Sequence, residues 1–262
     1  MSNWNNYLQN YTRYRDLRFS LDISRMEIPE SYVSELTPKI EKAFADSANL
    51  EAGAIANPDE GRMVGHYWLR NADLAPNDEI KDQITRPLAD LKKFAKDIHN
   101  GQIAAPNGGK FTNLLIVGIG GSALGPQLVY NALGDTSPMK TYFLDNTDPA
   151  GMDRVLKNLS SELSNTLTVV ISKSGGTAET RNGMLETQAA YEAANLKFAP
   201  HAVAVTGEGS KLDQFAKDFL AAFPMEDWVG GRTSLMSTVG LIPAALQGID
   251  IDAFLQGAAD MD

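Results

Sequence analysis

The sequence predicts an α/β protein with a doubly wound, five-stranded parallel sheet preceded by a helical N-terminal segment. From Phe111 onward, short apolar runs alternate with amphipathic helical stretches. These runs lack the polar–apolar alternation of a half-exposed strand, as is typical of parallel strands covered by helices on both faces. The chain has 262 residues, 43% of them hydrophobic and 21% charged, which is enough apolar material for a sizeable core.

Residues 1–110 form the predicted helical segment, because no run there alternates with a period of two over a convincing length. Asn77 is placed to cap a helix that reaches His99 and Gly101 and is broken or bent near Pro87. We expect this region to contribute packing. Residues 111–262 form the predicted α/β domain, with strands at residues 113–117, 141–144, 167–171, 202–205 and 225–229.

The helices between these strands have recognisable ends. Asp148 caps a helix whose first position is Pro149, and Ser210 precedes Asp213 with capping-box spacing. Gly134 ends the helix that follows the first strand.

The last helix begins near Asp250 and has no glycine or proline stop before Asp262. This position is unusual for a natural terminus. We therefore expect the chain to be a fragment of a longer protein.

Composition excludes several classes of partner. The net charge is −10, which opposes binding to a phosphate backbone, so we expect no nucleic-acid partner. The absence of cysteine and the three scattered histidines leave no thiolate or histidine cluster for a metal. No window has the roughly 18 apolar residues of a membrane span, and we expect a cytoplasmic protein without a membrane partner.

Residues 172–180 (SKSGGTAET) follow an apolar strand and open a helix. Two glycines let backbone N–H groups turn inward, and the helix N-terminus favours an anion. Ser172, Ser174 and Thr177 add hydroxyl donors and Lys173 adds a positive charge. The loop therefore predicts a phosphate cradle, and a simple polar turn is the alternative.

The loops after the other strands are expected at the same edge of the sheet, because ligands of open parallel sheets bind at the carboxyl ends of the strands. The loop sequences at this edge are residues 118–122, 145–148, 172–177, 206–207 and 230–234. Three of them are rich in glycine, and they bring Lys173 and Arg232 together. A guanidinium after Gly-Gly can stabilise charge that develops on oxygen, although it could also pair with a surface carboxylate.

A second interpretation concerns the first of these loops. Gly118, Gly120 and Ala123 fit the dinucleotide-binding fingerprint, and Asp145 follows the next strand where a ribose-binding acid belongs. An NAD-dependent dehydrogenase is therefore an alternative. It leaves residues 172–177 and 230–232 without a role.

Residues 118–126, 145–149, 172–180 and 230–232 resemble, in order, the signatures of the phosphoglucose isomerase family and its sugar-isomerase domains. The run from Glu60 to Arg70 resembles the motif upstream of the first such domain, so the resemblance covers about residues 57–262. It implies that the sugar phosphate of a hexose 6-phosphate is held by Gly121, Ser122, Ser172, Lys173, Ser174 and Thr177. Gly231 and Arg232 would lie beside C1 and C2, with Arg232 stabilising an enediolate.

The resemblance implies an aldose–ketose isomerase that needs no metal or organic cofactor and whose active sites are shared in a homodimer. In that family the base glutamate, the ring-opening histidine and a further lysine come from a second domain, and no matching motif precedes Asp262. Thr233 also departs from the aromatic residue that the family commonly has after Gly-Gly-Arg. We expect the chain alone to be inactive; a non-catalytic module that senses a sugar phosphate is the other alternative.

Overall fold

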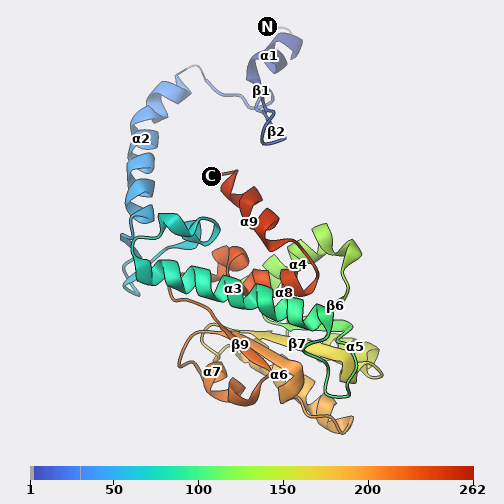
Figure 1. Ribbon diagram of the computed structural model, residues 1–262. Coiled ribbons are helices and arrows are strands. Elements are labelled where there is room, and N and C mark those ends of the chain that lie inside the picture. Colours follow the sequence, from blue (N-terminus) through green and yellow to red (C-terminus); the bar gives the residue numbers. More distant parts are fainter. Residues whose placement is uncertain (1–2, 30) are drawn as a thin grey trace.

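The computed structural model describes residues 3–29 and 31–262, and it confirms the predicted fold class (Figure 1). Five parallel strands form one sheet in the order β6-β5-β7-β8-β9. Strand order reverses beside β5, the first strand of the sheet in the sequence. The strands are β5 (Asn113–Val117), β6 (Lys140–Leu144), β7 (Thr166–Ile171), β8 (Ala202–Thr206) and β9 (Ala221–Pro224).

The sheet is buried on both faces, as its continuous apolar strands predict. Every residue of β5, β7 and β8 is buried. Leu114 and Ile116 belong to the core cluster on one face of the sheet, whereas Leu115 and Val117 belong to the cluster on the other face. Successive side chains of a strand point to opposite faces, so β5 contributes to both cores.

The helices begin where the sequence predicts. Asn77, Asp148 and Ser210 accept backbone hydrogen bonds at the starts of α3, α5 and α7, and Gly134 follows α4. The bounds of these helices are α3 (Asp78–Asn100), α4 (Gly121–Leu133), α5 (Pro149–Leu159), α6 (Ala178–Ala193), α7 (Lys211–Phe215), α8 (Thr238–Leu246) and α9 (Ile251–Ala259). α3 continues unbroken past Pro87.

The fifth strand is the one that the sequence misplaces. It was expected at residues 225–229, but β9 ends at Pro224. The apolar residues of this stretch, Met225, Trp228 and Val229, are buried without belonging to a strand, and the Trp228 ring lies 5.4 Å from that of Trp68. A short buried loop and a buried strand have the same apolar composition.

The N-terminal segment is also not purely helical. Between α1 (Asn3–Asn10) and α2 (Tyr32–Glu51), an antiparallel hairpin is formed by β1 (Tyr11–Tyr14) and β2 (Phe19–Asp22). After α2, a second antiparallel pair is formed by β3 (Ile55–Asn57) and β4 (Arg62–Met63). These strands have no buried residue and are at most four residues long. A period of two cannot be detected over such a length.

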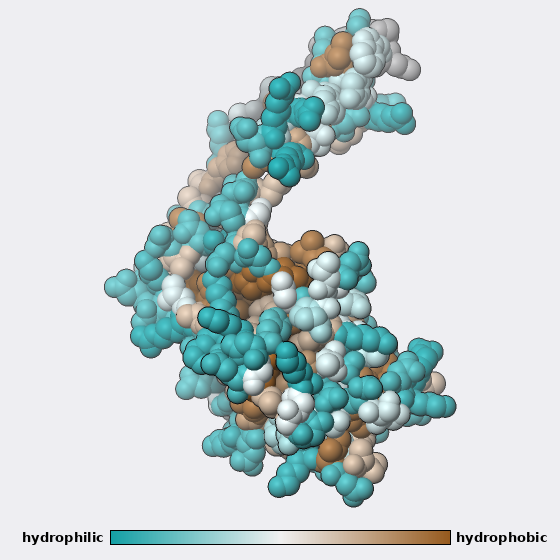
Figure 2. Space-filling model, turned by 45° about the vertical axis from the view of Figure 1, so that its right-hand side comes forward, coloured by the Kyte–Doolittle hydropathy of each residue, from teal (hydrophilic) through white to brown (hydrophobic). Residues whose placement is uncertain are grey.

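α1, the first hairpin and α2 form an arm that stands away from the α/β body (Figures 1 and 2). α2 contains no buried residue, and Val33 and Phe44 are 66% and 72% exposed. Figure 2 shows apolar surface at the base of this arm, facing the open space beside the body.

α3 precedes the predicted domain boundary at residue 110, and it packs on the sheet. Its buried residues Leu91, Phe94 and Ile98 share a core cluster with the strands. The division into residues 1–110 and 111–262 stays a prediction. Among the described residues, no helix combines the length and the apolar character that crossing a membrane requires.

Candidate functional site

A cavity of about 820 Å³ opens at the carboxyl ends of the strands. It lies where the topology of an open parallel sheet predicts a ligand. The predicted site residues that line it are Gly121, Ser122, Ser172, Lys173, Ser174, Thr177 and Gly231. Arg232 is outside this lining, with an exposed side chain that forms no hydrogen bond or ion pair within the described residues. The structure therefore gathers seven of the eight predicted residues in one wall.

The first and fifth loops touch through two glycines. A Cβ atom on Gly121 would lie 1.9 Å from the carbonyl oxygen of Gly231. Ser234 stabilises this contact, because its hydroxyl donates hydrogen bonds to the carbonyl oxygens of Gly231 at 2.8 Å and of Gly121 at 3.4 Å. Gly121 is thus required by the close approach of two backbones.

We expect Gly121→Ala to lower the free energy of unfolding by about 1–3 kcal/mol, because the added methyl group overpacks this contact. In an open helix position the same change would stabilise by about 0.5–1 kcal/mol, so the sign identifies the clash. Gly231→Ala is the matched control, since nothing lies within 4 Å of its added Cβ. Urea unfolding measures both, and equal stabilities would contradict the contact.

The 172–177 loop is held from within and from β8. The Ser172 hydroxyl accepts from the Gly175 N–H at 3.2 Å, and the Ser174 hydroxyl accepts from the Gly176 N–H at 3.1 Å. Thr206 donates to the carbonyl oxygen of Ser172 at 2.7 Å. Gly175 has φ +63°, and its added Cβ would lie 2.1 Å from the amide nitrogen of Leu212. The loop therefore rests directly on the start of α7.

Two helix N-termini at this cavity lack a side-chain cap. α4 begins after Gly120 and α6 begins after Thr177, and neither residue accepts a backbone hydrogen bond through its side chain. By contrast, side chains cap all the other α-helices from residue 78 onward, namely α3, α5, α7, α8 and α9. Uncapped N-terminal N–H groups and the helix dipole favour an anion.

Lys173 joins the third loop to the fifth. Its ammonium donates to the carbonyl oxygens of Asp227 at 2.7 Å and Val229 at 3.0 Å, and lies 3.6 Å from the Asp227 carboxylate. Burial lowers the pKa of the Lys173 ammonium, against the opposing attraction of Asp227. Much of its hydrogen-bonding capacity is thus used to hold the segment just before Gly231.

A group of charged side chains in the same wall was not predicted from the sequence. Arg62 lies 3.3 Å from Glu60 and 3.5 Å from Asp227, so β4 and the segment before Gly231 are joined by charge. Glu60 and Arg62 belong to the run from Glu60 to Arg70 that resembles a family motif, and this resemblance could have identified them as site residues. No sequence feature identified Asp227, because it lies within the strand predicted at residues 225–229.

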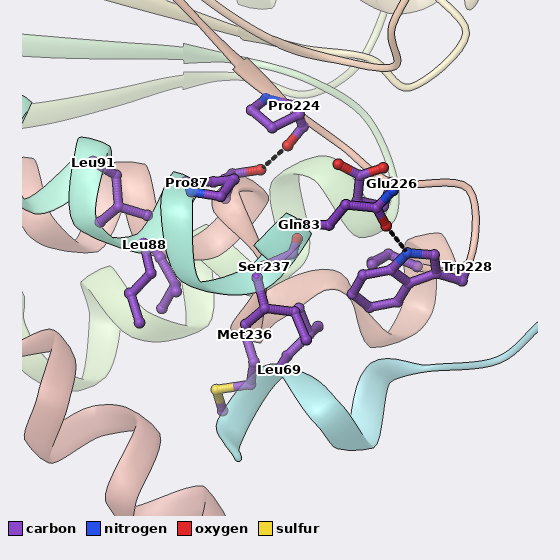
Figure 3. A pocket seen from close by; sticks show the side chains of 14 residues that line it. Leu69, Gln83, Pro87, Leu88, Leu91, Pro224, Glu226, Trp228, Met236 and Ser237 are labelled. Atoms are coloured by element: carbon purple, nitrogen blue, oxygen red, sulfur yellow. Dashed lines mark hydrogen bonds between the residues drawn. The ribbon is translucent and has the colours of Figure 1, made fainter. Parts of the chain in front are cut away.

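Glu226 is the half-buried acid that lines this cavity. It also lines a neighbouring pocket, together with Gln83 and Trp228 (Figure 3). Burial raises the pKa of its carboxyl group, and the nearby Glu208 and Asp227 raise it further, against Lys173. Trp228 beside it is fixed by a 2.8 Å hydrogen bond from its indole N–H to Gln83 (Figure 3). An acid at this place opposes anion binding when it is ionised and opposes it less when it is protonated.

We expect Glu226→Gln to raise the Tm at pH 7 and to leave it nearly unchanged near pH 4. The raised pKa of Glu226 means that its favourable contribution exists below the ordinary glutamate pKa and is lost as pH rises through the raised value. Thermal unfolding across this range measures the effect, with Glu186→Gln on the exposed face of α6 as control. A difference that is constant with pH would contradict this assignment.

The environment of Asp145 argues against the alternative of an NAD-dependent dehydrogenase. Its carboxylate accepts from the side-chain amides of Gln127 at 2.7 Å and Asn146 at 3.1 Å. A ribose would have to share this carboxylate with both amides, and Asp145 does not line the large cavity. Within residues 3–29 and 31–262, no group of three or more His, Cys, Asp or Glu side chains could hold a metal ion.

The histidines are outside this cavity. His99 Nε2 lies 2.9 Å from the carbonyl oxygen of Leu246, and His201 Nδ1 lies 2.7 Å from that of Lys197. His66 lies against the ring of Tyr67. None of the three lines the cavity.

The sequence model of the phosphoglucose isomerase family matches residues 22–262. The chain belongs to this family. A glucose-6-phosphate isomerase of Rippkaea orientalis is 61% identical over 261 residues, which are 99% of this chain and 49% of that protein. One from a Geobacter species is 54% identical over 262 residues, again 99% of this chain and 49% of the relative. The chain therefore spans about half the length of the curated isomerases it matches.

A solved structure of the phosphoglucose isomerase family has the same fold. The glucose-6-phosphate isomerase of Chlamydia trachomatis superposes with a TM-score of 0.82 at 28% identity, and the match covers 98% of this chain and 50% of the other. Family membership and the five-stranded parallel sheet, both predicted from the loop motifs and the apolar runs, are thereby confirmed.

Proposed function

We propose that this chain is the substrate-binding N-terminal part of a glucose-6-phosphate isomerase that interconverts glucose 6-phosphate and fructose 6-phosphate. The observation that carries the proposal is the meeting of two uncapped helix N-termini at one cavity in a chain of this family. The substrate class agrees with the relatives, which are glucose-6-phosphate isomerases.

In this proposal the N–H groups at the starts of α4 and α6 bind the phosphate, together with the hydroxyls of Ser122, Ser172, Ser174 and Thr177. Lys173 adds positive charge and holds the fifth loop in place through the carbonyl oxygens of Asp227 and Val229. The sugar carbons then extend toward Gly231, which also lines the cavity. No metal or organic cofactor takes part in the proposed reaction.

Arg232 stabilises the enediolate in this proposal. Its guanidinium is exposed and forms no ion pair within the described residues, so it is available to a substrate oxygen. Isomerisation needs a base for the carbon acid and a group that opens the sugar ring. We propose that the remaining half of an isomerase of the relatives' length supplies both, and that the whole protein is a cytoplasmic homodimer with shared sites.

Calorimetric titration with glucose 6-phosphate tests the cradle. We expect Ser122→Ala and Thr177→Val each to weaken binding about ten- to a hundredfold, because each removes a charge-assisted hydrogen bond worth about 1.5–3 kcal/mol. The Ser122 hydroxyl forms no hydrogen bond within the described part of the chain, so its removal leaves the fold intact. Ser160→Ala, at the far end of α5, is the control.

Titration with free glucose separates the contribution of the phosphate to binding from that of the sugar. Both variants should bind glucose as the unmodified chain does, because the altered hydroxyls contact only the phosphate. Unchanged affinity for glucose 6-phosphate in both variants would remove the cradle from the proposal. A sugar-phosphate sensor would show the same binding, and the two functions separate by the isomerisation assay of a protein of the relatives' length.

A further inference from the structure

A second cavity, of about 250 Å³, lies between α6 and α7. Its apolar wall consists of Val170, Met184, Leu185, Leu212 and Phe215. Phe215 is 48% exposed and Leu185 is 37% exposed, so the apolar wall reaches the surface. Ser172 and Thr180 line both this cavity and the larger one, which makes them the partition between the two.

The charge of this cavity is opposite to that of the protein. Arg181 and Lys211 are the charged residues of its lining, and both are exposed. Neither side chain forms a hydrogen bond or an ion pair with another residue in the described part of the chain. No carboxylate lines the cavity, although the whole chain carries a net charge of −10. Two unpaired cations beside an apolar wall are complementary to an anion with an apolar body.

We propose that this cavity binds a small amphipathic anion, whose ring or branched hydrocarbon packs on Met184, Leu212 and Phe215 and whose anionic group pairs with Arg181 and Lys211. The volume corresponds to roughly eight water molecules at liquid density, which suits one such small molecule. Burial of its apolar body against exposed Phe215 and Leu185 supplies the driving force.

Such a ligand would weaken the binding of a sugar phosphate, and this second step rests on the proposed function. Ser172 and Thr180 are shared, and Gly175 of the cradle rests on the Leu212 backbone at the start of α7. Two anions on opposite sides of one thin partition repel each other across it. By linkage each must lower the affinity of the other by the same factor.

Naphthalenesulfonate is the probe, and naphthalenemethanol is its uncharged counterpart. We expect saturable calorimetric binding of the sulfonate by the 262-residue chain and about tenfold weaker binding after the double change Arg181→Met and Lys211→Met. The variant Lys217→Met, which removes an exposed cation outside the cavity, should bind like the unmodified chain. The alcohol should bind weakly and equally to all three proteins.

Several results would overturn the site. These are sulfonate binding that the double change does not alter, alcohol binding as strong as sulfonate binding, or weakening by Lys217→Met to the same extent. Glucose 6-phosphate should weaken the sulfonate about twofold or more without excluding it; independent binding would overturn the coupling. If the chain binds the sulfonate through Lys211 but does not bind glucose 6-phosphate, the second cavity stands and the proposed function fails.

Discussion

We expect the 262-residue chain to bind glucose 6-phosphate while leaving the C2 hydrogen of the sugar unexchanged in deuterium oxide. Binding alone leaves the chemical barrier in place, because a carbon-acid proton must be removed by a positioned base. A missing general base costs about a hundred- to ten-thousandfold in rate. The chain covers only 49% of the Rippkaea orientalis isomerase, and in the proposed function the base lies in the other half.

Deuterium incorporation and fructose 6-phosphate formation are measured together, with a glucose-6-phosphate isomerase of the relatives' length as the positive control. The carboxylates that line the cavity are the groups within this chain that could act as a base and so contradict the prediction. Glu60 and Asp227 are paired with Arg62, whereas Glu226 has a raised pKa. Exchange by the 262-residue chain that disappears in Glu226→Gln would identify a base within this half and contradict the prediction.

The fold was predictable where burial followed directly from local sequence. β5 matches its predicted bounds, and β6, β7 and β8 differ from them by a single residue, since each is a short apolar run between two helical stretches. β9 was misplaced because Trp228 is buried by Trp68, a partner distant in sequence. The hairpin of β1 and β2 was missed because each strand has only four residues, too few for a period of two to be detected, and none of them is buried.

The site, like the fold, was predictable only where it follows from local sequence and strand topology. The meeting of Ser122, Ser172 and Gly231 in one cavity follows from the rule that parallel strands present their carboxyl ends at one edge. The partners of Lys173 could not be predicted in this way. They are carbonyl oxygens of a loop whose path depends on packing against α3 and on the buried Trp228. The acids near that loop, Glu226 among them, were missed for the same reason.

In an isomerase of the relatives' length that contains this chain, we expect Arg232→Ala to lower kcat about a hundred- to a thousandfold. Removing one preorganised donor from developing oxyanion charge costs about 2.7–4 kcal/mol. The loss should fall on kcat and leave KM nearly unchanged, because the enediolate exists only along the reaction path and the phosphate is held elsewhere. Arg232→Lys should recover part of the rate, since it restores the charge but not the planar fork.

Ser122→Ala provides the contrasting variant for the same assay. It weakens the phosphate site, so its main effect should be on KM when the phosphate is bound equally in the ground state and the transition state. The side chain of Arg232 is exposed, so its removal should leave the fold, and hence the Tm, unchanged. A turnover number that is insensitive to Arg232→Ala, or a change confined to KM, would move this arginine out of the reaction and into binding.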